Sequence, residues 1–153
     1  MSSVKKKVII SACILGEYCR YDGKTKKIEA VVEKYKDYEI IPFCPEAPLF
    51  GTPRERIDVV VDGGEYCIKK ESGEDVTAPL FDAIEAFIKE HPHADAIVLK
   101  AKSPSCGNGT TPLLDAERNI IGYGDGIAAS LFKEHYKKTP FFDENSLNLY
   151  LIH

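Results

Sequence analysis

The sequence predicts an α/β protein with a three-layer, Rossmann-like open sheet that is mostly parallel and carries a small β-hairpin addition. Three observations predict this class. Short apolar runs alternate with amphipathic segments, and the connections between them suit right-handed crossovers. Two apolar runs that flank a Gly-Gly turn predict the hairpin. With 153 residues, 44% hydrophobic and 29% charged, a single domain over residues 1–153 is expected.

The first part of the chain is predicted to form a strand, a long loop, a helix and a second strand. Val8–Ile10 is a short apolar run that suits a buried strand. Val31 and Tyr35 then lie at helical spacing, and Ile40–Phe43 is the next apolar run. The segment 44–56 holds three prolines and a glycine, so it is expected to lack regular structure.

A hairpin and a long helix are predicted next. Ile57–Val61 and Tyr66–Lys69 flank the Gly-Gly turn, and we expect this hairpin to be a peripheral addition to the sheet. Residues 80–88 carry an apolar stripe at helical spacing, which Asp75 or Thr77 can cap. The helix is expected to end at the following His-Pro step.

The last part of the chain completes the sheet. Ala94–Leu99 is apolar and rich in β-formers, which predicts a central strand. A helix is expected over 127–132, introduced by the glycine-rich segment 122–126, and an edge strand over 140–142. The glycine-rich segment only weakly resembles a phosphate-binding loop, because no lysine follows it at the required spacing.

Three cysteines each follow a predicted strand. Cys13 follows the first strand, Cys44 follows the second, and Cys106 lies in the loop after the central strand. The carboxyl ends of parallel strands meet at one edge of a sheet, so we expect these thiols to meet there. Three thiolates suit a soft metal centre that keeps one coordination position for a substrate.

The sequence gives less reason to expect that the other cysteines and the histidines bind a metal. Cys67 lies inside the apolar hairpin and is expected simply to pack, as buried cysteine commonly does. Cys19 lies in the same loop as Cys13, where it can supply a fourth thiolate or line the site. The four histidines lie at predicted helix ends or at the terminus and are not expected to be ligands: His91, His93, His135 and His153.

Groups suited to proton transfer lie beside these thiols. Glu46 lies two residues after Cys44, where it is either a buried acid or base in the crevice or an ordinary solvated loop residue. Ser103 and Ser105 precede Cys106, and either hydroxyl can bind a substrate or relay a proton. The alternative for both serines is turn formation through bonds to the backbone.

Charge and hydropathy argue against several classes of partner. The formal net charge of −4 gives no broad attraction to nucleic acid or to anionic lipid. No stretch approaches the ~20 apolar residues of a membrane span, and the basic N-terminus lacks a full export signal. We therefore expect a cytoplasmic protein, whose five cysteines serve a metal or catalysis more than disulfides.

Several sequence blocks occur in an order that resembles the DUF523 family, whose characterised relatives are thiouracil desulfidases. The resemblance covers nearly the whole chain. The blocks are Ser11–Gly16 (SACILG), Cys19–Gly23 (CRYDG), Cys44–Glu46 (CPE), Gly51–Arg54 (GTPR) and Lys102–Gly107 (KSPSCG).

The resemblance implies a 4Fe-4S cluster bound by Cys13, Cys44 and Cys106, with the fourth iron free to bind substrate sulfur. It also implies that sulfide is released from a small thiolated heterocycle, such as a thiolated nucleobase, by hydrolysis without net redox change. Glu46 and Ser103 match the family's acid/base carboxylate and catalytic serine. The segment after Cys106 departs from the pattern of many members, which bears on substrate specificity more than on the cluster.

Three alternatives to this hydrolase remain open at the level of sequence. A sulfur transferase would hand the sulfide to an acceptor, or would use Cys19 as a persulfide carrier. A non-enzymatic iron-sulfur sensor would need an output surface, and the sequence shows no basic or DNA-binding region for one. Three cysteines can also bind zinc.

Overall fold

Four parallel strands form the first sheet. This computed structural model describes residues 5–15, 29–51 and 55–145. The strands are β1 (Lys7–Ser11), β2 (Glu39–Phe43), β5 (Ala96–Val98) and β8 (Phe141–Phe142), in the order β2-β1-β5-β8. The predicted α/β class with a parallel sheet is confirmed. Because β2 and β5 lie on opposite sides of β1, the sheet has a switch point, where a crevice forms at the carboxyl ends of the strands.

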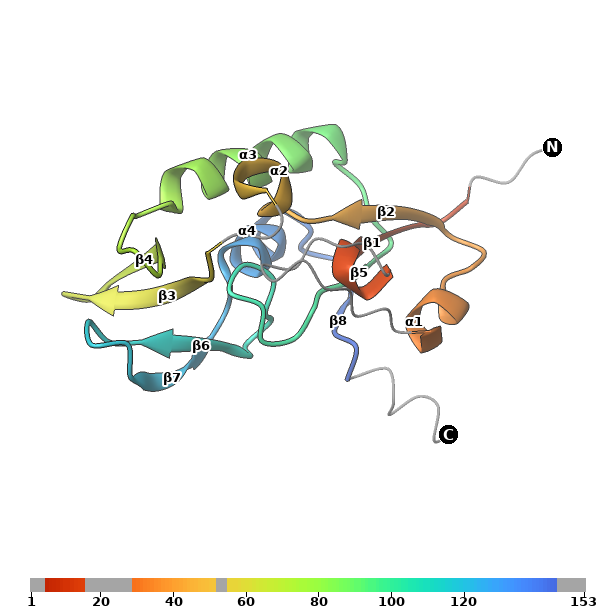
Figure 1. Cartoon of the computed structure of the whole chain (residues 1–153). Coiled ribbons are helices and arrows are strands. Elements are labelled where there is room, and N and C mark those ends of the chain that lie inside the picture. The colour runs from red at the N-terminus through yellow and green to blue at the C-terminus, as the bar shows by residue number, and fades with distance from the viewer. Residues whose placement is uncertain (1–4, 16–28, 52–54, 146–153) are drawn as a thin grey trace.

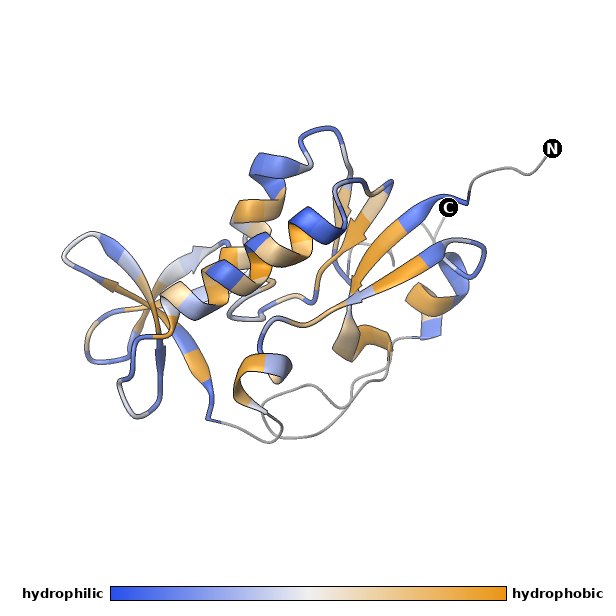
Figure 2. Ribbon diagram, turned by 90° about the horizontal axis from the view of Figure 1, so that it is seen from above, coloured by the Kyte–Doolittle hydropathy of each residue, from blue (hydrophilic) through white to orange (hydrophobic). Residues whose placement is uncertain are grey.

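Helices cover both faces of this sheet, which gives three layers (Figure 1). On one face, η1 (Ala12–Leu15) and α1 (Glu29–Lys34) pack against alternate residues of β1. On the other face, α3 (Thr77–Glu90) and α4 (Ile127–His135) pack against Ile9. Burial on both faces explains the nearly continuous apolar runs of these strands, which Figure 2 shows in orange.

The predicted hairpin belongs to a second sheet. Its strands are β3 (Ile57–Asp62), β4 (Glu65–Lys70), β6 (Thr111–Leu114) and β7 (Ile120–Gly124), in the order β4-β3-β6-β7. Only the β3–β6 pair is parallel. The expectation that the hairpin adds to the edge of the parallel sheet is therefore wrong. The first three residues of the glycine-rich segment before α4, 122–124, lie in β7.

Helix α3 joins the two sheets. Its N-terminal turn packs through Leu80 against the core of the second sheet, whereas Ile84 and Ile88 pack against the first. The prediction that Asp75 or Thr77 caps this helix is wrong, because Val76 occupies the N-cap position without a side-chain cap bond. Asp75, one residue earlier, still accepts the backbone N–H of Thr77 at 2.9 Å. Because one rigid helix contacts both cores, it fixes the position of the second sheet relative to the carboxyl edge of the first.

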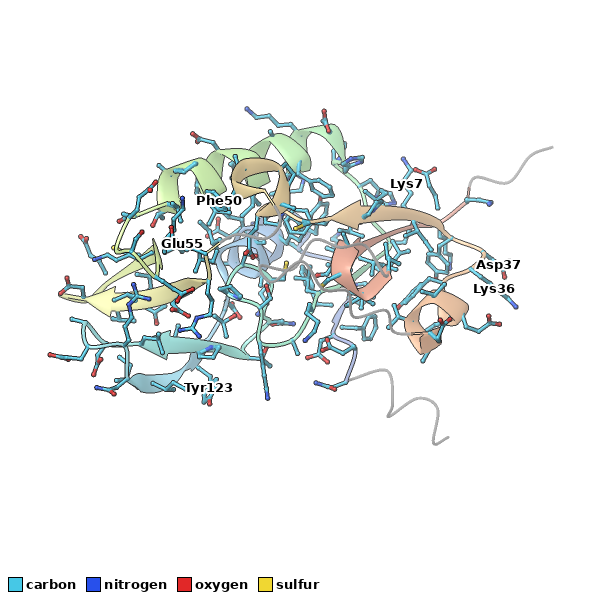
Figure 3. All side chains as sticks on the ribbon, in the orientation of Figure 1. Lys7, Lys36, Asp37, Phe50, Glu55 and Tyr123 are labelled. Atoms are coloured by element: carbon cyan, nitrogen blue, oxygen red, sulfur yellow. The ribbon has the colours of Figure 1, made fainter. Side chains whose placement is uncertain are left out.

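One proline-rich segment is more regular than expected. The short helix α2 (Ala47–Phe50) follows Cys44 and contains Pro48 in its first turn, where no backbone N–H is required. The expectation of irregular structure is thus wrong for these residues, while 52–54 lie outside the described residues. Phe50 packs against the core of the second sheet (Figure 3). No helix within the described ranges is long and apolar enough to cross a membrane.

Candidate iron-sulfur and catalytic site

A cavity of about 570 Å³ lies between the carboxyl edge of the first sheet and one side of the second. The first sheet and its loops contribute Ser11, Cys13, Cys44, Glu46, Lys100, Ser103, Ser105 and Cys106. The second sheet contributes residues that include Arg56, Asp58, Leu114, Arg118 and Ile120. The structure therefore brings the three cysteines, the carboxylate and both serines of the sequence prediction to the wall of one cavity.

The three thiols come from three separate connections. Cys13 lies in η1 directly after β1, Cys44 directly follows β2, and Cys106 lies in the long loop after β5. Cys13 and Cys44 are partly exposed to the cavity, whereas Cys106 is only 4% exposed. The Sγ of Cys44 accepts the backbone N–H of Ala47 at 3.5 Å, a contact that favours the thiolate form.

The thiol of Cys106 is buried among negatively charged neighbours. Burial, together with the nearby charges of Cys13, Cys44 and Glu46, raises the pKa of this thiol to about 12. A hydrogen bond with Ser11 opposes the rise. These groups are thus close enough for their charges to interact. A metal centre in the cavity would offset this repulsion by binding the deprotonated sulfurs.

The thiols are not gathered around a single point. Across residues 5–15, 29–51 and 55–145, no three Cys, His, Asp or Glu side chains lie close enough together to hold one metal ion. In an iron-sulfur cluster each thiolate binds a different iron, so its protein ligands are spaced more widely than those of one ion. Three sulfurs around one cavity are compatible with that wider spacing.

Glu46 is buried beside these thiols. It directly precedes α2, and its backbone carbonyl accepts the N–H of Phe50 at 2.9 Å. Its side chain is turned into the protein, where Oε2 accepts the hydroxyl of Ser105 at 2.7 Å. Glu46 is 8% exposed, so it is not the solvated loop glutamate that the sequence left open.

Ser103 organises the loop that carries Cys106. Its Oγ accepts the backbone N–H groups of Ser105 at 3.3 Å and Cys106 at 3.0 Å. Its carbonyl accepts the N–H of Gly107 at 3.0 Å and the hydroxyl of Thr111 at 2.6 Å. Ser103 therefore forms the turn that was the alternative to a catalytic role, and it also lines the cavity. Its O–H proton is not consumed by these four bonds.

The sequence matches the 2-thiouracil desulfurase family over residues 8–144. The chain belongs to this family. The resemblance to the DUF523 family is confirmed, because a solved structure similar to this one is that of the 4Fe-4S-dependent thiouracil desulfidase TudS (DUF523Vcz). The two chains are 31% identical with a TM-score of 0.69, and the match covers 96% of this chain and 99% of that one. The uncharacterized protein YbbK of Bacillus subtilis (strain 168) is 31% identical over an alignment of 151 residues, and the match covers 92% of this chain and 97% of that protein.

In this member of the 2-thiouracil desulfurase family, a buried ion pair anchors the loop after β5. Lys100 Nζ lies 2.8 Å from Glu144 Oε2, and Glu144 Oε1 accepts the backbone N–H of Ala101 at 2.8 Å. The N–H of Lys100 donates to Ser11 Oγ at 2.9 Å. This anchor could not be predicted from the sequence, because nothing in the local pattern links Glu144 to residues more than 40 positions earlier.

The opposite wall of the cavity is also polar. Arg118 donates to Asp58 Oδ2 and to the carbonyl of Lys70, each at 2.8 Å, and Arg56 lies 3.5 Å from the same carboxylate group. Arg118 has a positive φ of 68°, so these bonds hold a residue in a sparsely populated conformation. This side of the cavity could not be predicted from the sequence, because β6 and β7 were not predicted as strands.

The remaining candidates lie elsewhere or outside the described residues. Cys67 lies on β4 and does not line the cavity. It is only half-buried and belongs to none of the core clusters of the described residues, so the buried packing role expected for it is not observed. His93 pairs with Asp95 at 3.2 Å, and His135 contacts the carbonyl of Pro92 at 3.4 Å, both away from the cavity. Cys19 lies outside the described residues, as does the terminal histidine.

Proposed function

We propose that this chain is an iron-sulfur-dependent desulfidase that removes sulfur as sulfide from a thiolated heterocycle such as thiouracil. Residues 1–153 would form one desulfidase domain in a reducing compartment such as the cytoplasm, where its thiols stay free. The observation that carries the proposal is that three cysteines and a buried carboxylate, from four separate positions in the chain, line one cavity. Family membership and the description of TudS support it.

Cys13, Cys44 and Cys106 fit a 4Fe-4S cluster as its protein ligands, because they are three thiols from different elements and no fourth thiol lines the cavity within the described residues. Such a cluster would supply a Lewis acid for sulfur at an iron without a protein ligand. The N–H of Ala47 and the hydrogen bond from Ser11 would help to hold the sulfurs in the thiolate form.

The chain's own groups would then carry out the hydrolysis. The carboxylate of Glu46 accepts a proton from a water molecule, whose oxygen attacks the thiocarbonyl carbon of the substrate. The hydroxyl of Ser103 orients the heterocycle. The new C–O bond replaces the C–S bond, so thiouracil and water give uracil and hydrogen sulfide without a change in oxidation state. The buried walls exclude bulk water and keep these groups in position.

The test is an anaerobic assay of the reconstituted protein with 2-thiouracil. We expect uracil and sulfide in equal amounts, with no added reductant or sulfur acceptor. Substitution Glu46→Gln keeps the size and an acceptor oxygen but removes the base, so kcat should fall by about 10²- to 10⁴-fold. Visible absorption provides the control that the variant still holds the cluster. A cluster-loaded Glu46→Gln protein that works at the full rate contradicts the role of Glu46, and a requirement for an acceptor favours sulfur transfer instead.

A further inference from the structure

The buried hydroxyl of Ser105 has no role in the proposed reaction. Ser105 is 0% exposed, and its Oγ donates to Glu46 Oε2 at 2.7 Å. A hydroxyl that donates to a carboxylate at this distance makes a strong, charge-assisted hydrogen bond. Because Glu46 is itself 8% exposed, little water is available to replace this donor.

The backbone of Ser105 is held on both sides. Its carbonyl accepts the N–H of Ala128 from the first turn of α4 at 2.8 Å, and its N–H donates to Ser103 Oγ. The approach of α4 is so close that a Cβ at Gly126 would lie 2.5 Å from the Ser105 carbonyl. The Ser105 hydroxyl is thus fixed in place by the fold, before any substrate binds.

Ser105 also contacts the hydroxyl of Ser103, and its bond to Glu46 determines which of the two hydroxyls donates. The two hydroxyl oxygens lie 3.4 Å apart. A serine has one hydroxyl proton, and that of Ser105 is given to Glu46, so Ser103 is the donor in this contact until a bound heterocycle accepts its proton. The Sγ of Cys106 lies at 3.8 Å from Ser105 Oγ, a longer contact that competes weakly for the same proton. The three side chains therefore form a directed series from Ser103 through Ser105 to Glu46.

We infer that Ser105 is a positioning residue that holds the Glu46 carboxylate in its reactive orientation. The inference rests on the proposed function, in which Glu46 is the base. Ser105 stands in the cavity wall with 0% of its surface exposed, and its hydroxyl acts through the Glu46 carboxylate to which it donates. Its loss should therefore slow the reaction step and leave substrate binding nearly unchanged.

The first test compares Ser105→Ala with the wild-type protein, both carrying the cluster. We expect kcat for 2-thiouracil to fall by about 10- to 100-fold, as for other small misplacements of reacting groups, while KM changes by less than about threefold. The visible absorption should stay unchanged. The matched control is Thr139→Val, which removes a hydroxyl that donates to the carbonyl of Ala94, away from the cavity, and which should retain the wild-type kcat.

A second pair of variants measures the effect of the Ser105 hydroxyl alone. This pair also tests the inference if Ser105→Ala does not fold. Ser105→Thr and Ser105→Val add equal volume and differ only in the hydroxyl group. The Thr variant should be at least about tenfold faster than the Val variant, because only Thr can still donate to Glu46. Equal kcat values in this pair, or a wild-type kcat in Ser105→Ala, would overturn the inference.

A readout independent of activity separates this inference from the proposed function. The infrared difference spectrum between each protein and its Glu46→Gln counterpart isolates the carboxylate stretch of Glu46. We expect that stretch to shift when Ser105 becomes Ala or Val, and to stay in place with Thr. An inactive wild-type protein that shows this shift would refute the proposed function alone, whereas an unshifted band would refute the positioning role alone.

Discussion

Asp95 is a partly exposed carboxylate that joins the first residues of two neighbouring strands. Its Oδ2 accepts the backbone N–H of Lys7 at 2.8 Å, and its own N–H donates to the carbonyl of Lys7. The bond from the Lys7 N–H holds the pKa of Asp95 below its ordinary value of 3.8, and His93 adds to this effect. One side chain therefore helps to set the register of β1 against β5.

We predict that Asp95→Ala lowers the free energy of unfolding by about 0.5–1 kcal/mol at pH 7, a small value because solvent screens a side chain that is 32% exposed. The folded pKa is lower than the unfolded pKa, so the stabilisation is fully present above the unfolded value near 3.8. It is lost as the pH falls through the folded pKa. Urea unfolding of both proteins at pH 7 and at about pH 3 measures this. The same difference at both pH values would show that the carboxylate charge does not contribute.

The positions of some site residues could be predicted from the sequence, whereas the roles of others could not. Cys13, Cys44 and Glu46 could be placed at the crevice because each lies within a few residues of the end of an apolar strand. The choice between Ser103 and Ser105 could not be made, since the two hydroxyls flank one proline and differ only in which of them reaches Glu46. That contact joins residues 59 positions apart, and only the packing of α4 against the loop determines it.

Two backbone hydrogen bonds join the start of α4 to the loop that carries Cys106. The N–H of Gly126, just before the helix, donates to the carbonyl of Gly107 at 2.8 Å, and the first turn donates to that of Ser105. A side chain at position 126 would force the helix away from the loop. The glycine is thus required for the close approach and not for an unusual backbone angle, since its φ is −68°.

We predict that Gly126→Ala destabilises the protein by about 1–3 kcal/mol, because its Cβ would overlap the Ser105 carbonyl. The matched control is Gly122→Ala in β7, where an added Cβ meets no atom within 4 Å and the change should be within about 0.5 kcal/mol. Denaturant midpoints of the two variants measure the difference. Equal midpoints would mean that α4 can move back from the loop at no cost.

The segment after β8 anchors the loop after β5 through the buried pair of Lys100 and Glu144. The side chains of this pair are 16% and 8% exposed. Glu144→Ala leaves the Lys100 ammonium and the Ala101 N–H without their buried acceptor. We therefore predict a loss of about 2–4 kcal/mol in unfolding free energy. Glu33→Ala, which breaks an exposed 2.9 Å pair with Lys36, should leave the unfolding free energy nearly unchanged, because solvent screens this pair. Thermal unfolding compares the two, and similar losses would contradict the anchoring role.

At the level of elements, the sequence predicted best where both faces of a strand are buried. The parallel strands β1, β2 and β5 have apolar runs that identify them directly. Of the second sheet, only β3 and β4 were predicted. Strand β6 is short and contains Pro112, while β7 contains Gly122 and Gly124. Such residues normally argue against a strand, and here the pairing with β3 outweighs them.

The whole molecule places its reactive groups between two sheets. The carboxyl edge of the parallel sheet supplies the thiols and Glu46, while the second sheet closes the cavity with Arg56, Asp58 and Arg118. Helix α3 packs on both sheets and holds these two walls in a fixed relative position. The sequence could predict the first wall from the topology of parallel strands, but not the second, which depends on strands it did not reveal.

The proposed function requires that Cys13, Cys44 and Cys106 together hold one 4Fe-4S cluster. Its most direct test is the iron content and visible absorption of the protein after anaerobic reconstitution with iron and sulfide. We predict charge-transfer absorption and about four irons per chain for the wild type and for Cys67→Ser, whose thiol lies away from the cavity, and a loss of both in each of the three cavity Cys→Ser variants. A wild-type protein that binds no iron, or cavity variants that load as fully as Cys67→Ser, would contradict the claim.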